Sequence, residues 1–86
     1  MKPKMEYIAL CGSVVGSGPF RTEYAFDGKR FPDRAVAISH GFTLGRSDDF
    51  NIGVLRDGRL VSVDWMEKTV DAAPDLMAKI GKDIGL

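Results

Sequence analysis

The 86-residue sequence contains a single cysteine, Cys11, and a single histidine, His40. One cysteine excludes a disulfide within the chain, and a structural zinc site needs more thiol and imidazole groups than these two residues supply. We therefore expect no bound metal. A protein with so little use for cysteine fits a reducing compartment, and we expect the cytoplasm.

Long apolar runs and net charge are also missing. The run at residues 7–11 is far shorter than the ~20 residues of a membrane span and too short for a signal peptide, so we expect no membrane association. Twelve basic and twelve acidic residues cancel to a net charge of zero. The chain as a whole therefore has no field that would draw it to nucleic acid.

The composition is that of a globular protein, with 44% hydrophobic and 28% charged residues. The length is enough for one domain and too short for two, so residues 1–86 are predicted to form a single domain. A chain of this size has a thin core.

The first part of the chain favours strands. Residues 5–15 are rich in apolar and β-branched side chains, and residues 20–26 alternate between apolar and polar ones. The Gly/Ser/Pro segment 16–19 predicts the loop between them. Asp27-Gly28 predicts a tight turn, after which residues 29–31 form a short return or lead into a helix.

Two Pro-Asp pairs predict helix starts. Proline suits the first helical turn, and aspartate suits the positive end of the helix dipole, so helices are expected from Pro32-Asp33 and from Pro74-Asp75. Gly41 is placed to end the first helix in a left-handed conformation. The second helix has an apolar stripe of Leu76, Met77, Ile80 and Ile84.

Residues 50–66 predict a β-hairpin that turns at Asp57-Gly58, a pair that favours a type I′ turn. A two-residue loop fixes the pairing, so Arg56 is expected opposite Arg59 and Leu55 opposite Leu60. Further pairs would be Val54 with Val61, Ile52 with Val63, and Phe50 with Trp65. One face then forms the core, with Phe50, Ile52, Val54, Val61, Val63 and Trp65.

The expected element order is ββαββα, with residues 67–73 as a connection. This order predicts an α+β fold: one four-stranded antiparallel sheet with both helices packed on one face. The opposite face would stay open, with Leu55 and Leu60 as an apolar pair near the hairpin tip.

The glycines at positions 12, 16 and 18 suggest the phosphate-binding turn of a dinucleotide site. That turn must lead into a helix whose N-terminus faces the pyrophosphate. Here Pro19 and a strand follow, so a hairpin loop is favoured and no cofactor is expected.

Cys11 and His40 are the candidate catalytic residues, as a thiol–imidazole pair in which Asp48 or Asp49 could orient the imidazole. Cys11 lies in an apolar strand, where cysteine usually has only a packing role. A cysteine-dependent enzyme is therefore the third of three hypotheses, and a non-enzymatic role is favoured.

Basic residues flank both turns: Lys29 and Arg30 follow one, and Arg56 and Arg59 enclose the other. If both turns lie at the same edge, these residues form a positive rim on which nucleic acid could bind. Charged hairpin tips are also common for solubility, so nucleic-acid binding is the second hypothesis.

The first hypothesis is a protein-binding module of the accessory, inhibitor or immunity type, acting as a monomer or a homodimer. An exposed apolar patch with a polar surround often marks a contact surface. The predicted partner-binding residues are Leu55, Leu60, Arg56, Arg59, Lys29 and Arg30.

Overall fold

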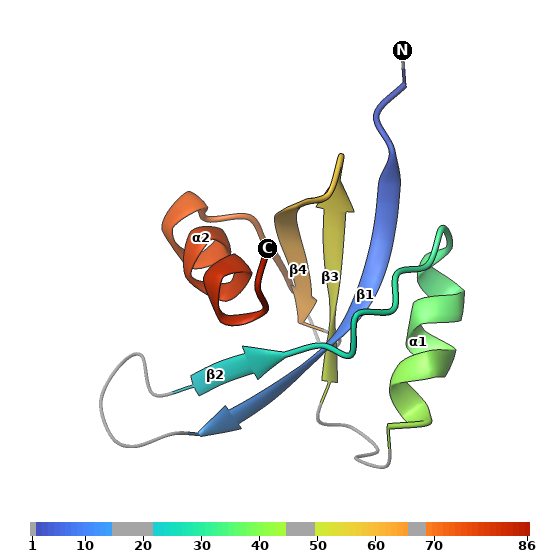
Figure 1. Ribbon diagram of the computed structural model, residues 1–86, viewed down its shortest axis with the longest axis horizontal. Coiled ribbons are helices and arrows are strands. Elements are labelled where there is room, and N and C mark those ends of the chain that lie inside the picture. The colour runs from blue at the N-terminus through green and yellow to red at the C-terminus, as the bar shows by residue number, and fades with distance from the viewer. Residues whose placement is uncertain (1, 15–21, 45–49, 66–68) are drawn as a thin grey trace.

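The chain folds into an antiparallel sheet with two helices. The structure is a computed structural model, and it describes residues 2–14, 22–44, 50–65 and 69–86. Its elements are β1 (Met5–Val14), β2 (Thr22–Ala25), α1 (Arg34–Phe42), β3 (Phe50–Arg56), β4 (Arg59–Trp65), β5 (Thr69–Asp71) and α2 (Pro74–Asp83). The strands lie side by side in the order β2-β1-β3-β4-β5 (Figure 1).

The predicted α+β class, antiparallel sheet and two helices are confirmed, but the sheet has five strands and not four. The additional strand, β5, lies within residues 67–73, for which the sequence predicts only a connection. Three residues are too few for an alternating pattern to be recognised, and the strand exists because Val70 pairs with Asp64 of β4. The order is therefore ββαβββα.

Strand β1 lies between β2 and β3 in the sheet and pairs with both. Its residues 5–11 pair with β3, and its residues 11–14 pair with β2. Tyr7 also pairs with Phe31, through backbone hydrogen bonds of 2.7 and 2.9 Å. The segment after the Asp27-Gly28 turn therefore makes the short return that the sequence suggests, and it returns to β1.

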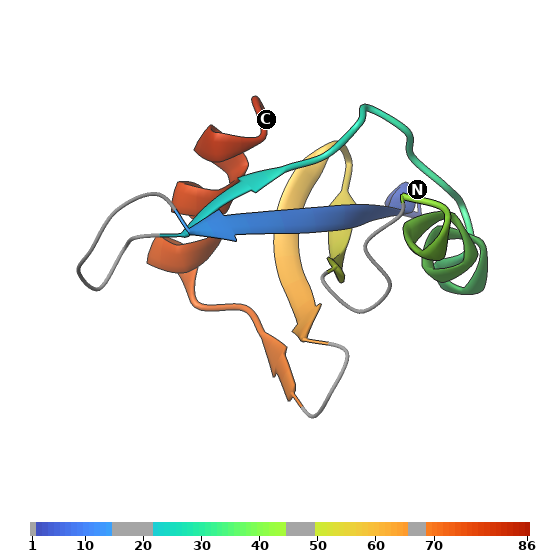
Figure 2. The ribbon, with the colours of Figure 1, turned by 90° about the horizontal axis from the view of Figure 1, so that it is seen from below.

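The two helices pack on opposite faces of the sheet, so the prediction of both helices on one face is wrong. Ile8 and Leu10 of β1 pack with the buried residues of α2, whereas Ala9 between them packs with α1. Because neighbouring side chains of a strand point to opposite faces, each helix covers its own face. Figures 1 and 2 show the central strands passing between the helices.

The hairpin tip agrees with the sequence, and the rest of the hairpin does not. Asp57 and Gly58 have positive φ angles of 52° and 83°, and Arg56 faces Arg59 as predicted. The register then shifts between Val54 and Leu55. Val54 consequently faces Ser62, and the predicted pairs Val54–Val61, Ile52–Val63 and Phe50–Trp65 are wrong. Val61 is the extra residue of a β-bulge.

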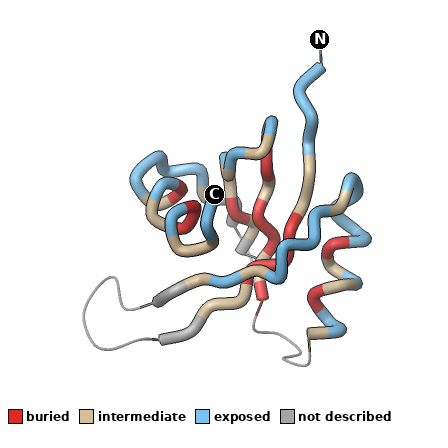
Figure 3. Tube along the Cα trace, in the orientation of Figure 1, coloured by how far each residue is buried: buried red, intermediate tan, exposed pale blue. Residues whose placement is uncertain are grey.

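The shift divides the predicted core between the two faces. Phe50 and Ile52 are buried on the α1 side, whereas Val63 is buried on the α2 side. Val61 is 37% exposed, and the side chain of Trp65 lies outside the described residues. Figure 3 shows the buried positions concentrated in the middle of the sheet and along the helices.

Helix α1 begins just after the predicted Pro32-Asp33 start, with Pro32 outside the helix, and its end also differs from the prediction. The Asp33 side chain accepts a hydrogen bond of 2.9 Å from the backbone N–H of Ala35, which makes Asp33 the N-cap. Gly41 lies inside the helix and not in the left-handed conformation expected after its end. Its function is close packing, because a Cβ at Gly41 would lie 2.3 Å from the Phe50 ring.

Helix α2 starts at Pro74 as predicted, and its apolar stripe faces the sheet. Ile80 is fully buried, and Met77 is 6% exposed. Leu76 and Ile84 are half-buried against the same cluster. In the described part of the chain, neither helix has the length and apolar character needed to cross a membrane.

Candidate functional site

The apolar pair predicted to face outward is covered by α2. Leu55 is fully buried, so its assignment to an exposed contact surface is wrong. Leu60 is half-buried and packs against the same cluster. The prediction fails because it assumes that one face of the sheet is open.

The basic residues around the Asp57-Gly58 turn do come together. Arg56 and Arg59 are exposed cross-strand partners beside the turn. Arg30 reaches the same place, because a Cβ at Gly58 would lie 3.8 Å from its Nη1 atom. Lys29, the residue before Arg30, follows the Asp27-Gly28 turn and is exposed.

The same end of the sheet also holds acidic groups and the N-terminal segment. The backbone N–H of Lys4 donates to the Asp57 carboxylate (3.0 Å), and the N–H of Asp57 donates to the Lys4 carbonyl (2.9 Å). Glu6 lies 3.7 Å from Arg30 and 4.0 Å from the ammonium of Lys4. The positive rim is therefore partly neutralised.

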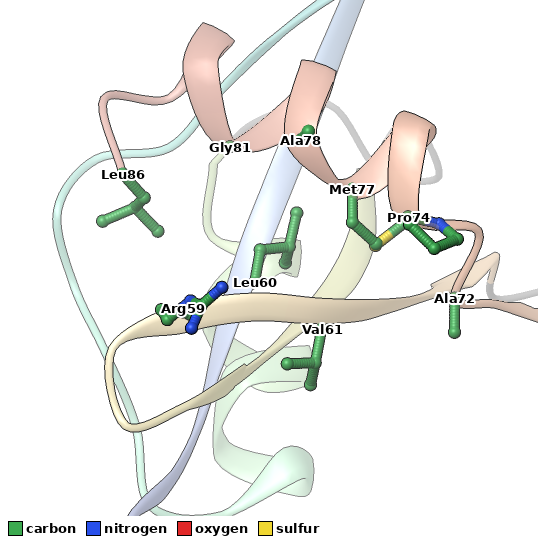
Figure 4. A pocket seen from close by; sticks show the side chains of 9 residues that line it. All are labelled: Arg59, Leu60, Val61, Ala72, Pro74, Met77, Ala78, Gly81 and Leu86. Atoms are coloured by element: carbon green, nitrogen blue, oxygen red, sulfur yellow. The ribbon is translucent and has the colours of Figure 1, made fainter.

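A groove of about 460 Å³ lies between β4 and α2 (Figure 4). We call it the β4–α2 groove. In Figure 4 the side chain of Leu60 points from β4 toward the helix, and the side chain of Val61 points away from it. The groove is lined by Arg59, Leu60, Val61, Ala72, Pro74, Met77, Ala78, Gly81 and Leu86.

Small side chains keep this groove open. Pro74, Met77, Ala78 and Gly81 are spaced to share one side of α2, and two of the four are alanine and glycine. A Cβ at Gly81 would meet only the carbonyl oxygen of Leu86, at 3.6 Å. The helix therefore presents a shallow apolar wall to β4.

Strand β4 contributes Arg59, Leu60 and Val61 to the groove, and its outer edge is only partly paired. β5 pairs only with residues 63–65 of β4. Within the described part of the chain, no strand pairs with the outer edge of residues 59–62. Arg59 is the only charged residue in the lining, and no described carboxylate forms an ion pair with it.

His40 and Asp27 form a second polar site, on the α1 side. The Nε2 atom of His40 lies 2.6 Å from a carboxylate oxygen of Asp27, and the ring lies 5.0 Å from that of Phe31. Burial would raise the pKa of the Asp27 carboxyl. Hydrogen bonds from His40 and from the N–H of Lys29, with their positive charges, outweigh burial and hold that pKa below its usual value.

The thiol–imidazole hypothesis stays a prediction. Cys11 is half-buried against the apolar cluster on the α1 side. Asp48 and Asp49 lie outside the described residues, and the partner that the structure gives His40 is Asp27. No group of three or more His, Cys, Asp or Glu side chains among the described residues is arranged to hold a metal ion.

Comparison with protein-family models, with curated proteins and with solved structures gave no match to this chain.

The groove combines residues that the sequence singles out with residues that it does not. Arg59 and Leu60 are among the predicted contact residues, and both line the groove. The α2 wall was not expected. The sequence feature that could have indicated this wall is the pair of small residues, Ala78 and Gly81, on the same side of the helix as Met77.

Proposed function

We propose that this chain is a non-enzymatic protein-binding module whose contact surface is the β4–α2 groove. The observation that carries the proposal is an open groove with a mixed polar and apolar lining, beside a sheet edge with which no described strand pairs. Apolar grooves between a strand and a helix are common sites for segments of partner proteins. Two exposed hydrophobic residues, Val61 and Leu86, add apolar surface to its rim.

The test is to find peptides that bind and then to close the groove. Peptides are selected from a random linear library displayed on phage, synthesised, and titrated against the purified protein. Ala78→Trp fills the groove from α2. Ala35→Trp is the matched control, because Ala35 is also an exposed helical alanine but lies in α1.

We expect Ala78→Trp to raise the Kd by about tenfold or more, which corresponds to about 1.4 kcal/mol. Ala35→Trp should leave the Kd unchanged. Both positions are exposed, so both variants should unfold at the same denaturant concentration as the parent. If no peptide is selected, or if the selected peptides bind Ala78→Trp as well as the parent, the groove is not the contact surface.

The basic residues at the hairpin tip favour nucleic-acid binding as a second candidate. Arg30, Arg56 and Arg59 come from two distant segments and meet beside Gly58. Phosphate contacts of this kind weaken steeply with salt. A mixed-sequence oligonucleotide should bind at about 50 mM salt and dissociate at about 200 mM, and Arg56→Glu should abolish binding. Absence of binding at the lower salt would exclude this candidate.

A further inference from the structure

We infer, on the basis of the proposed function, that the partner segment enters the β4–α2 groove as an extended strand that pairs with the outer edge of β4, and that it places an acidic group against Arg59. The site is thus a strand-addition site for an acidic peptide.

The edge has the length of a short peptide. Residues 59–62 of β4 have no strand on their outer side among the residues that the structure describes. At about 3.4 Å per residue, four residues offer about 14 Å of pairing edge. Added strands bind mainly through main-chain hydrogen bonds to such an edge, and pockets for alternate side chains select the sequence.

The position of β5 shows where the peptide strand would lie. β5 pairs with β4 at residues 63–65, and the chain then leaves the edge through Ala72 to begin α2 at Pro74. A peptide beside residues 59–62 therefore continues the row that β5 begins. Ala72 has a small side chain where β5 and the peptide would meet, and it lines the groove.

The α2 wall of the groove determines which kind of side chain fits at every second position of the peptide. Alternate side chains of an extended strand face the same side. On the side toward α2 they meet Met77, Ala78 and Gly81, which provide apolar contacts and space. Aliphatic residues at alternate positions fit that wall.

The charge of the lining identifies the remaining feature of the partner. Arg59 is exposed, has the only charged side chain among the described lining residues, and forms no ion pair with any described carboxylate side chain. A second copy of the chain would bring another arginine to the edge and no acid from its own groove. An acidic peptide complements the site, because guanidinium groups bind carboxylates through paired, charge-assisted hydrogen bonds.

Two sets of titrations test the inference, using the peptides selected from the random library. In the first, single backbone N-methyl groups are placed along the best peptide. Methylation should weaken binding by about fivefold at every second residue, where the N–H faces β4, and be tolerated between them. In the second, Arg59→Glu should weaken an acidic peptide by about tenfold or more. Arg56→Glu is the matched control, since Arg56 is the cross-strand partner of Arg59 and does not line the groove.

The outcomes separate this inference from the proposed function. If Ala78→Trp blocks binding but methylation has no alternating effect, the groove binds peptides in another conformation and strand addition is wrong. In that case the bulge at Val61 protects the edge from pairing. Selected peptides without acidic residues, or equal effects of Arg59→Glu and Arg56→Glu, would overturn the acidic specificity. A dimer in sedimentation that the peptide dissociates would make a second copy the occupant. If Ala78→Trp does not affect binding, the proposed function itself fails.

Discussion

Helices α1 and α2 cover opposite faces of one sheet in different ways. On the α1 side, Gly41 brings the helix backbone against the Phe50 ring, and two polar side-chain pairs tie the helix to the rest of the molecule. These pairs join Arg34 to Asp64 of β4 and His40 to Asp27. On the α2 side the core contains larger side chains, yet a groove remains between the helix and the edge of β4.

The difference depends on what a small helical residue faces. Gly41 faces a buried aromatic ring, so the missing side chain lets helix and sheet approach closely. Gly81 is also buried, but a Cβ there would meet only the Leu86 carbonyl at an ordinary contact distance, so the missing side chain is not needed for close packing, and Gly81 lines the groove. The first arrangement brings helix and sheet into close contact, and the second leaves the groove that we propose as a contact surface.

The largest expected effects test whether both faces are cores. Ile52 and Leu55 lie on the same strand, face opposite helices and are both fully buried. Replacing either with alanine should destabilise the protein by about 2–5 kcal/mol in urea unfolding. Val61→Ala is the control and should cost less than about 1 kcal/mol, because Val61 is partly exposed. A mild effect at Leu55 would mean that the α2 face is not a core.

The two helical glycines should respond in opposite directions to the same change. Gly41→Ala should destabilise the protein by about 1–3 kcal/mol, because the new methyl group overlaps the Phe50 ring. Gly81→Ala should stabilise it by about 0.5–1 kcal/mol, because alanine favours helix and the site has room. Thermal unfolding of the two variants beside the parent measures both values. The same sign for both would remove the contrast between the helices.

The N-termini of the helices offer a smaller contrast. Asp33 caps α1 with its side chain, whereas Ala73 at the start of α2 has no side chain that can accept a hydrogen bond. Asp33→Ala should cost about 1 kcal/mol, and Ala73→Ser should add a few tenths to 1 kcal/mol. Denaturation midpoints detect both changes, and a loss of stability on Ala73→Ser would show that the start of α2 cannot accept a cap.

The smallest expected effect is the pH dependence of the free energy of unfolding that comes from Asp27, on the α1 side of the sheet. The pKa of Asp27 is lowered in the folded state, so its ionised form contributes stability above the unfolded pKa of about 3.9. This contribution disappears as the pH falls through the lower, folded pKa. The stability difference between the parent and Asp27→Asn should therefore be present at neutral pH and shrink below about pH 4. A constant difference across a pH series of urea titrations would contradict the assignment.

Features specified by local chemistry could be predicted from the sequence. The Pro-Asp pairs predict both helix starts, because capping and fixed φ angles act within one turn. Asp57-Gly58 predicts the hairpin tip, because few residue pairs adopt two successive positive φ angles.

Features specified by packing could not be predicted in the same way. The bulge at Val61 changes the β3–β4 register by one residue and places Val63 on the α2 side of the sheet. No neighbouring residue in the sequence indicates this bulge. Residues 7–11 form an unbroken apolar run, and such a run is typical of a strand that is covered on both faces. The groove depends on how β4 and α2 meet, so only its small residues could have suggested it.

The hydrogen bonds between Lys4 and Asp57 join residues 53 positions apart in the chain. The β3–β4 hairpin forms through a local turn. Most residues of β1 pair with β3, so their backbone hydrogen bonds can form only after β3 is in place. Closing such a long loop is entropically costly and slows folding. Strand β1, although it lies inside the finished sheet between β2 and β3, is therefore the one we expect to be incorporated late, onto a template that the Asp57-Gly58 turn has already formed.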